Sequence, residues 1–213
     1  MPKKAQTPRI YVLAGTNGAG KSSIAGAMLI EEGIEYFNPD EAAELIRVAN
    51  PGITLEESQS AAWDEGRRLL ERAINERLDY AFETTLGGTI PALLEKAMEA
   101  GIKVRIWYVG LTNVELHIAR VQARVKRGGH DIPEQRIRQR YPRSLLNLIQ
   151  LMPNLTELRV YDNSLEADPH TGIAPEPRLI VHLNREKLLS VCELASTPAW
   201  AKPIVLKALT SRL

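Results

Sequence analysis

The sequence contains one cysteine, Cys192, among its 213 residues, and it has no long apolar run. A single cysteine excludes an internal disulfide framework and a cysteine-rich zinc site, and it favours a reduced, cytoplasmic setting. A transmembrane helix needs about 18 consecutive apolar residues, so none is expected. The basic start MPKKAQTPR leads directly into IYVLAG. This run is too short for a signal peptide and indicates a buried strand.

An excess of charge of either sign is also missing. The 27 Lys and Arg side chains nearly balance the 26 Asp and Glu side chains, which leaves a formal net charge of +1. The chain as a whole therefore has no strong attraction to nucleic acid or to membranes, and any basic surface must be local. The sequence also shows no repeats and no low-complexity tract. Its length fits a single α/β domain over residues 1–213.

Short apolar runs alternate with longer amphipathic stretches along the chain. This alternation predicts βαβ units and a mainly parallel sheet, because strands that are covered on both faces are apolar throughout. The expected strands are residues 10–14, 34–37, 80–82, 104–109, 158–161 and 179–183. The expected helices are residues 21–32, 40–48, 54–77, 89–100, 113–126 and 133–151. Thr54 and Glu57 have the spacing of a capping box at the start of the third helix.

The segment from Gly15 to Ser22 reads GTNGAGKS and matches the phosphate-binding pattern GxxxxGK[ST] in full. Glycines allow a tight turn to aim backbone N–H groups at phosphate oxygens, and the helix that follows adds its positive N-terminal end. Lys21 would reach the β- and γ-phosphates of ATP, and the Ser22 hydroxyl would bind Mg²⁺. The expected nucleotide contacts in this segment are Gly15, Thr16, Asn17, Gly18, Ala19, Gly20, Lys21, Ser22 and Ser23.

A glycine turn that precedes a lysine by chance is the alternative interpretation of this segment. The match follows an apolar run and opens a helical pattern, which is the context that nucleotide binding requires. We therefore expect a three-layer αβα P-loop fold. Its sheet is expected to have the strand order 2-3-1-4-5, in which strand 1 precedes the glycine loop.

Two carboxylates follow the expected second and third strands. Asp40 ends the segment NPD, and Glu83 is followed by Thr84 and Thr85. Ligands of open α/β sheets bind beyond the C-terminal ends of the strands, so both acids are candidates to hold Mg²⁺ or to take a proton from an acceptor hydroxyl. Asp40 could instead be the N-cap of a helix that begins at Glu41. Glu83 could form a salt bridge at the end of the sheet, and the two threonines could be caps or substrate ligands.

Basic residues gather between residues 120 and 143. They are Arg120, Arg124, Lys126, Arg127, Arg136, Arg138, Arg140 and Arg143. Two helical patterns flank the joint formed by Gly128 and Gly129, which is typical of a helical lid that closes over phosphates and neutralises the transferring group. The alternatives are a solvated basic face and contacts to a nucleic-acid backbone. Within this segment no Phe, Tyr or Trp that could stack on bases lies among the arginines before Tyr141, so nucleic acid is not an expected partner.

The order of these motifs resembles the zeta toxin family of P-loop kinases. The resemblance rests on the glycine loop followed by NPD at residues 38–40 and FETT at residues 82–85. It continues through RGGHDIP at residues 127–133, RYPR at residues 140–143 and VYDNS at residues 160–164. The resemblance covers roughly residues 8 to 185, and the combination of these motifs is more specific than the glycine loop alone.

The resemblance implies a function and a set of roles. Members of the family transfer the γ-phosphate of ATP to a hydroxyl of UDP-N-acetylglucosamine, and an antitoxin protein blocks their nucleotide site. The family pattern implies Asp40 as the general base and Glu83 as a residue on the substrate side. It implies Lys21 and Ser22 as nucleotide and metal ligands. Arg127 and Arg140 are the implied catalytic arginines of the lid.

These observations together predict an ATP- and Mg²⁺-dependent kinase that acts on a hydroxyl of a small molecule, with a UDP-sugar as the candidate acceptor. Asp40, Lys21, Arg127 and Arg140 are expected to be catalytic, and Arg124 is expected to contact the nucleotide. Thr84 and Thr85 are expected to join Glu83 on the substrate side. The two rival functions are a polynucleotide kinase and an ATP-binding regulatory module without a small-molecule acceptor.

Overall fold

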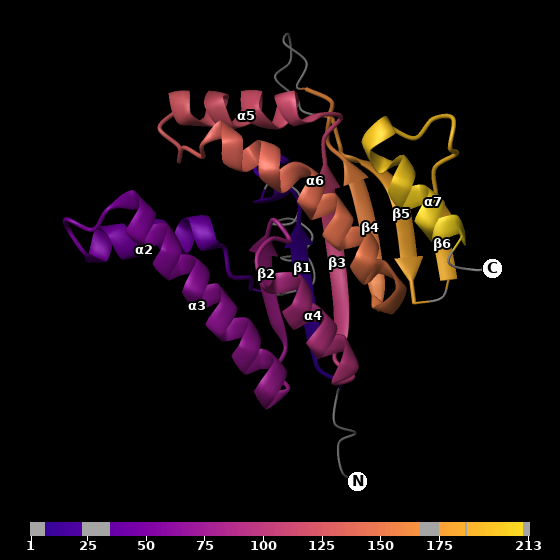
Figure 1. Cartoon of the computed structure of the whole chain (residues 1–213), viewed down its shortest axis with the longest axis horizontal. Coiled ribbons are helices and arrows are strands. Elements are labelled where there is room, and N and C mark those ends of the chain that lie inside the picture. Colours follow the sequence, from indigo (N-terminus) through magenta and orange to yellow (C-terminus); the bar gives the residue numbers. More distant parts are fainter. Residues whose placement is uncertain (1–6, 23–34, 167–174, 186, 211–213) are drawn as a thin grey trace.

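A computed structural model describes residues 7–22, 35–166, 175–185 and 187–210 of the chain. Its centre is a mixed sheet of six strands in the order β2-β1-β3-β4-β5-β6 (Figure 1). The strands are β1 (Arg9–Ala14), β2 (Tyr80–Thr84), β3 (Lys103–Gly110), β4 (Glu157–Asp162), β5 (Arg178–Asn184) and β6 (Lys187–Val191). The first four strands in this order pair in parallel, and the last two pairings are antiparallel. The mainly parallel sheet is therefore confirmed.

The predicted strand order differs from the observed order in one detail. Of the expected second strand, residues 34–37, only Phe37 pairs, through a single parallel bridge to Phe82 of β2, and residue 34 lies outside the described residues. The apolar runs at 80–82, 10–14, 104–109 and 158–161 then follow one another across the sheet as expected. Strand β6 was not expected, because its residues are mostly exposed and do not form an apolar run.

The described helices are α2 (Pro39–Ala49), α3 (Leu55–Glu76), α4 (Ile90–Glu99), α5 (Val114–Lys126), α6 (Glu134–Leu151) and α7 (Lys202–Thr210). Five of them match expected helices to within two residues at either end, and α7 was not expected. Lys21 and Ser22 are helical, but residues 23–32 of the expected first helix lie outside the described residues. The Thr54–Glu57 capping box is present, with both reciprocal hydrogen bonds formed.

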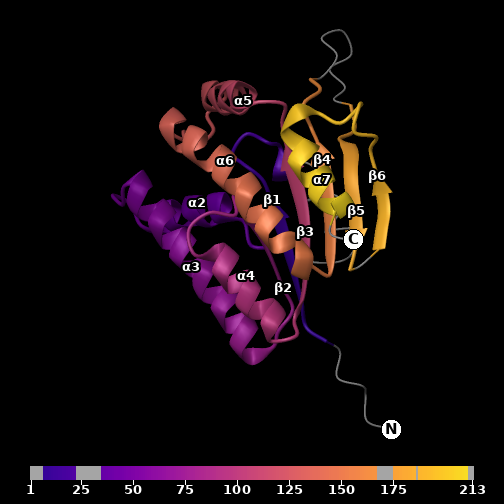
Figure 2. The ribbon, with the colours of Figure 1, turned by 45° about the vertical axis from the view of Figure 1, so that its right-hand side comes forward.

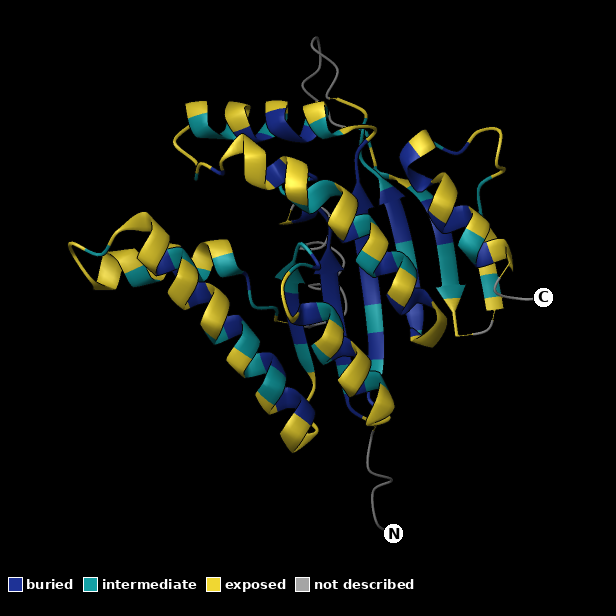
Figure 3. Ribbon diagram, in the orientation of Figure 1, coloured by how far each residue is buried: buried dark blue, intermediate teal, exposed yellow. Residues whose placement is uncertain are grey.

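The main core lies between the sheet and helices α4, α6 and α7, which cover one of its faces (Figures 1 and 2). The central strand β3 is buried along most of its length, as a strand in the middle of an α/β sheet must be. Buried and exposed residues alternate around each of the covering helices (Figure 3). This packing fixes the C-terminal ends of β1 and β2, where the candidate site is built.

A candidate phosphoryl-transfer site

The glycine loop follows β1 and is held between the ends of three other elements. Gly15, Gly18 and Gly20 have φ values of 143°, 82° and 83°, which side chains disfavour. A Cβ on Gly15 would collide with the carbonyl oxygen of Val109 at the end of β3. A Cβ on Gly18 would lie 2.5 Å from the carbonyl oxygen of His117, and one on Gly20 would lie 2.6 Å from Asn163 Nδ2. The loop therefore needs glycine for its conformation and for these close contacts.

Lys21, Ser22 and Glu83 form one contiguous polar cluster. The Lys21 side chain is buried, and its Nζ donates a hydrogen bond to the Gly15 carbonyl at 2.9 Å. The same Nζ lies 3.3 Å from Glu83 Oε1, and the Ser22 hydroxyl donates to Glu83 Oε2 at 2.9 Å. The salt bridge considered as an alternative role for Glu83 is thus formed, and its partner is the lysine of the glycine loop. Ser23 lies outside the described residues.

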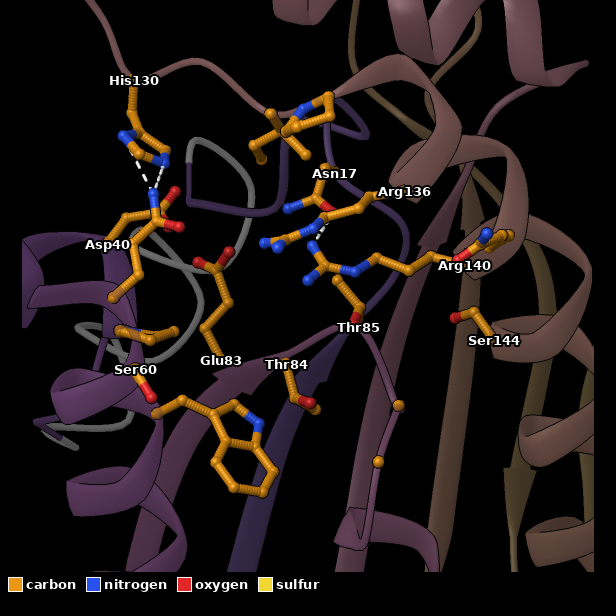
Figure 4. Close-up of a pocket in the computed structure, with 18 of the residues that line it drawn as sticks. Asn17, Asp40, Ser60, Glu83, Thr84, Thr85, His130, Arg136, Arg140 and Ser144 are labelled. Carbon is orange, nitrogen blue, oxygen red and sulfur yellow. Dashed lines mark hydrogen bonds between the residues drawn. The ribbon is translucent and has the colours of Figure 1, made fainter. Parts of the chain in front are cut away.

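A cleft of about 580 Å³ opens beside this cluster (Figure 4). Its walls come from α2 and α3 on one side and from α6 with the preceding connection on the other, and its floor follows β2. The predicted site residues that line it are Asn17, Asp40, Glu83, Thr84, Thr85 and Arg140. The fold therefore brings the tip of the glycine loop, two carboxylates and an arginine to one cavity.

Asp40 lies in the first turn of α2 and points into the cleft (Figure 4). The N-cap of this helix is Asn38, whose side-chain oxygen accepts a hydrogen bond from the Asp40 backbone N–H at 3.0 Å. The capping role considered for Asp40 therefore belongs to Asn38. The Asp40 carboxylate is 45% exposed and lies 3.4 Å from Arg124 Nη1. Helix capping does not occupy this carboxylate, and its long ion pair with Arg124 leaves close to half of the side chain exposed.

The predicted arginines lie in different surroundings. Arg140 Nη1 donates to the side-chain oxygen of Asn17 at 2.8 Å, and burial lowers the pKa of its guanidinium. Arg124 contacts Asp40 and also donates to the carbonyl of His130 at 2.8 Å. Arg127 donates to the carbonyl of Ala123 at 3.2 Å and does not line the cleft. Arg140 therefore lines the cleft beside the glycine loop and Arg127 does not, and the catalytic roles expected for both stay predictions.

His117 is a buried contact of the glycine loop that the sequence analysis missed. This α5 residue is 1% exposed, and its Nδ1 donates to the Asn17 carbonyl at 2.8 Å. Burial lowers the pKa of His117 to about 4, so the ring is neutral at physiological pH. The one sign in the sequence that His117 is buried is its place on the inward-facing side of an amphipathic helix. That pattern indicates packing and does not point to a contact with the glycine loop.

Asn163 forms a second contact to the loop from the end of β4. Its Nδ2 donates to the carbonyl of Ala19 at 2.8 Å. The glycine loop is thus fixed by side chains from α5, from α6 and from the segment after β4, in addition to its own glycines.

The oxygens of this cluster are of the kind that bind Mg²⁺ when phosphates and water supply most of the ligands. Within the described ranges, no group of three or more His, Cys, Asp and Glu side chains is arranged to hold a metal ion. Mg²⁺ usually binds through one or two protein oxygens together with phosphates and water. Ser22 and Glu83 present such oxygens beside a buried lysine.

Among the residues that the structure describes, no helix has the length and apolar character to cross a membrane.

A glycine loop on the first strand of a parallel sheet, with a lysine and a carboxylate beside an arginine-lined cleft, defines the class of P-loop kinases. Within that class, the chain belongs to the zeta toxin family. The family model described as "Zeta toxin" matches residues 1–167. The resemblance noted in the sequence is therefore confirmed.

Several known proteins resemble the chain. An uncharacterized protein of Haemophilus influenzae is 34% identical over 132 residues, which cover 60% of this chain and 88% of that protein. The crystal structure of AvrRxo1-ORF1:AvrRxo1-ORF2 with ATP superposes with a TM-score of 0.62 at 15% identity. That match covers 98% of this chain but 65% of the other, so this chain spans slightly less than two thirds of its length.

The PezAT chromosomal toxin–antitoxin system of Streptococcus pneumoniae also superposes, with a TM-score of 0.54 at 18% identity. That match covers 75% of this chain and 70% of the other. At such identities the two structural matches establish the fold, which is the α/β fold expected from the sequence.

Proposed function

We propose that the chain is an ATP- and Mg²⁺-dependent kinase that transfers the γ-phosphoryl group to a hydroxyl of a small molecule. The observation that carries this proposal is the cleft shared by Asn17 of the glycine loop, Glu83, Asp40 and Arg140. A phosphate site alone would suit any nucleotide-binding protein. A cavity that adjoins the phosphate site and contains a carboxylate without a capping role suits a second substrate.

The glycine loop is suited to the phosphates of ATP. Its glycines leave no room for a Cβ against the neighbouring backbone, and the buried Lys21 ammonium supplies a positive charge next to the loop. Ser22 and Glu83 would hold Mg²⁺, which neutralises phosphate charge when it is bound. Lys21 would remain close to the phosphates and to the metal, because it contacts the loop backbone and Glu83.

Asp40 is the residue we assign as general base. Its carboxylate lines the cleft and is half-exposed, so it is able to take a proton from an acceptor hydroxyl. Arg140 is assigned to the transferring phosphoryl group, since its guanidinium contacts the tip of the glycine loop. In a phosphoryl transfer, most of the rate enhancement comes from this kind of positioning and charge neutralisation.

The family supplies the finer part of the proposal. A UDP-sugar is the first acceptor class to test, with Thr84 and Thr85 as hydroxyl partners on the cleft floor. The PezAT structure is described as a toxin–antitoxin system, and by analogy we propose an antitoxin protein as a partner of this chain. The proposed kinase activity does not depend on that partner.

Incubation with ATP, Mg²⁺ and a panel of hydroxyl compounds, followed by mass spectrometry, tests the proposed function. A kinase yields a phosphorylated acceptor together with ADP. A regulatory module binds ATP and yields no phosphorylated product. A polynucleotide kinase yields product from oligonucleotides, and its binding weakens steeply with salt.

A further inference from the structure

Trp63 is the exposed member of the chain's three tryptophans. Its exposed fraction is 42%, whereas Trp107 and Trp200 are exposed by 3% and 6%. Tryptophan has a large apolar surface, and leaving it in water forfeits the favourable free energy of burial. A tryptophan that remains this open in an otherwise well-buried set is therefore a candidate for contact with a ligand.

The packing of α3 does not need the Trp63 side chain. The buried stripe of this helix contains Ala62, Gly66, Leu70 and Ala73, which follow helical spacing. Trp63 lies beside this stripe and lines the cleft together with Ser60, which is one turn earlier on the same helix. Figure 4 shows Ser60 and Thr84 facing the same part of the cavity. The indole thus belongs to the part of the cleft formed by α3 and the loop after β2.

Two contacts hold the indole in a defined orientation. Gly88 adopts a φ of 60°, and a Cβ on it would lie 3.2 Å from Trp63 Cζ2, so the ring edge rests against bare backbone. The guanidinium of Arg67, one turn further along α3, lies 5.7 Å from the centre of the ring. Arg67 is itself paired with Glu71 at 2.7 Å. The ring is thus held in place while it keeps an open surface, as a binding platform requires.

We propose that Trp63 is a specificity-determining residue of the acceptor part of the cleft, where its indole packs against a ring of the acceptor. The ring is a nucleobase, which stacks its flat face on an aromatic side chain, or a sugar ring, which packs its apolar C–H face against one. This inference rests on the proposed kinase function, because it assigns the cavity beside the phosphate site to the acceptor. Acyclic hydroxyl compounds gain nothing from such a platform.

Intrinsic fluorescence provides the binding test. Because Trp107 and Trp200 are buried, a ligand-dependent change in emission reports mainly on Trp63. We would titrate the chain with UDP-glucose, glucose 1-phosphate, uridine diphosphate and glycerol 3-phosphate. The three ring compounds distinguish a sugar ring from a nucleobase, and glycerol 3-phosphate is the ring-free control. We expect at least one ring compound to change the emission of the wild type but not that of Trp63→Phe.

Steady-state kinetics with the same compounds provide the functional test. Trp63→Ala is expected to raise the KM for the best ring acceptor by roughly 5- to 100-fold and to leave the KM for ATP unchanged, while Trp63→Phe stays within a few-fold of wild type. Leu55→Ala is the matched control, because Leu55 lies on the same helix with 40% exposure and does not line the cleft. It should not alter either KM.

Three results would overturn the inference about Trp63. They are a Trp63→Ala variant with wild-type KM for a ring acceptor, an equal preference for glycerol 3-phosphate, and an emission spectrum that no ring compound changes. The proposed kinase function fails in a different way. If ring compounds change the Trp63 emission but ATP never phosphorylates them, the stacking site stands and the kinase assignment is wrong.

Discussion

The ammonium of Lys21 lies 3.3 Å from the carboxylate of Glu83, and both side chains are almost fully buried. Glu83 also accepts a hydrogen bond from the Ser22 hydroxyl, so one acid joins the two residues that a phosphate loop uses for nucleotide and metal. A buried charge needs a partner, and each residue of this pair supplies one for the other.

Glu83→Gln is expected to weaken the apparent affinity of the site for Mg²⁺. The amide keeps the size of the side chain but removes the charge that pairs with Lys21 and that, in the proposed function, supports the metal. Turnover should fall, and more Mg²⁺ should be needed for half-maximal rate. The free energy of unfolding, measured with urea, should drop by roughly 1–3 kcal/mol because a buried charged contact is lost. An unchanged Mg²⁺ requirement would separate Glu83 from the metal.

Asp40→Asn should abolish most of the transfer without unfolding the protein. An asparagine cannot accept the proton of an acceptor hydroxyl, so kcat should fall by roughly 10²- to 10⁴-fold while ATP affinity is kept. Calorimetry with ATP and a transfer assay separate the two effects. Wild-type activity in this variant would mean that another group is the base.

Asn38→Ala is the matched control for Asp40. Asn38 is the residue that caps α2, so its loss should lower stability by about 1 kcal/mol. Thermal unfolding should therefore distinguish the two neighbours. Asn38→Ala lowers the melting temperature more than Asp40→Asn does, whereas Asp40→Asn has the larger effect on transfer.

The two predicted lid arginines should differ in importance. Arg140 contacts Asn17 in the cleft, whereas Arg127 binds a carbonyl of its own helix. We expect Arg140→Ala to lower kcat by roughly 10²- to 10³-fold, in the range of a lost electrostatic contact to the transition state. Arg127→Ala is expected to have the smaller effect. If both variants lose activity equally, the segment between α5 and α6 must rearrange during the reaction and bring Arg127 to the substrate.

His117 should make the stability of the fold depend on pH. Burial lowers its pKa from 6.5 to about 4 in the folded chain, so the unfolded chain binds a proton more readily between these values. The neutral ring therefore contributes to the free energy of unfolding above pH 6.5, and this contribution is lost as the pH falls toward 4. At about 1.36 kcal/mol per pH unit, the loss reaches about 3 kcal/mol.

The control for this effect is His117→Gln, which can still donate to the Asn17 carbonyl but does not titrate. The free energy of unfolding, measured with urea at several pH values, should change less with pH for the variant than for the wild type between pH 4 and 6.5. Identical slopes would show that other groups, such as carboxylates, cause the whole dependence on pH.

The elements that the sequence predicted well are those with a strong local signal. The glycine loop has a fixed pattern, and the helix from Leu55 to Glu76 has both an amphipathic stripe and the Thr54–Glu57 capping box. Strand β6 and helix α7 were missed because their signals are weak. Strand β6 is largely exposed, and its pairing to β5 is non-local. The apolar run before Phe37 resembled a strand, but only Phe37 pairs with the sheet among its described residues.

The residues of the site were predictable as a group, whereas their partners were not. Strand ends of a parallel sheet meet at one edge, so Asp40 and Glu83 could be placed near the loop from sequence alone. Asn38 rather than Asp40 is the helix cap because α2 begins at Pro39, two residues before the expected start at Glu41. The contact of His117 with Asn17 joins positions 100 residues apart, and no local pattern encodes it. The same holds for Arg140, whose contact with Asn17 distinguishes it from Arg127.

An assay that follows the labelled γ-phosphate from ATP to a hydroxyl compound tests the proposed kinase activity most directly. The wild-type chain, ATP, Mg²⁺ and a panel that includes UDP-sugars should yield a phosphorylated acceptor, and Lys21→Ala should yield none. Product formed equally by Lys21→Ala, or ATP bound by the wild type without any phosphorylated acceptor, would contradict the assignment of this cleft as a kinase site.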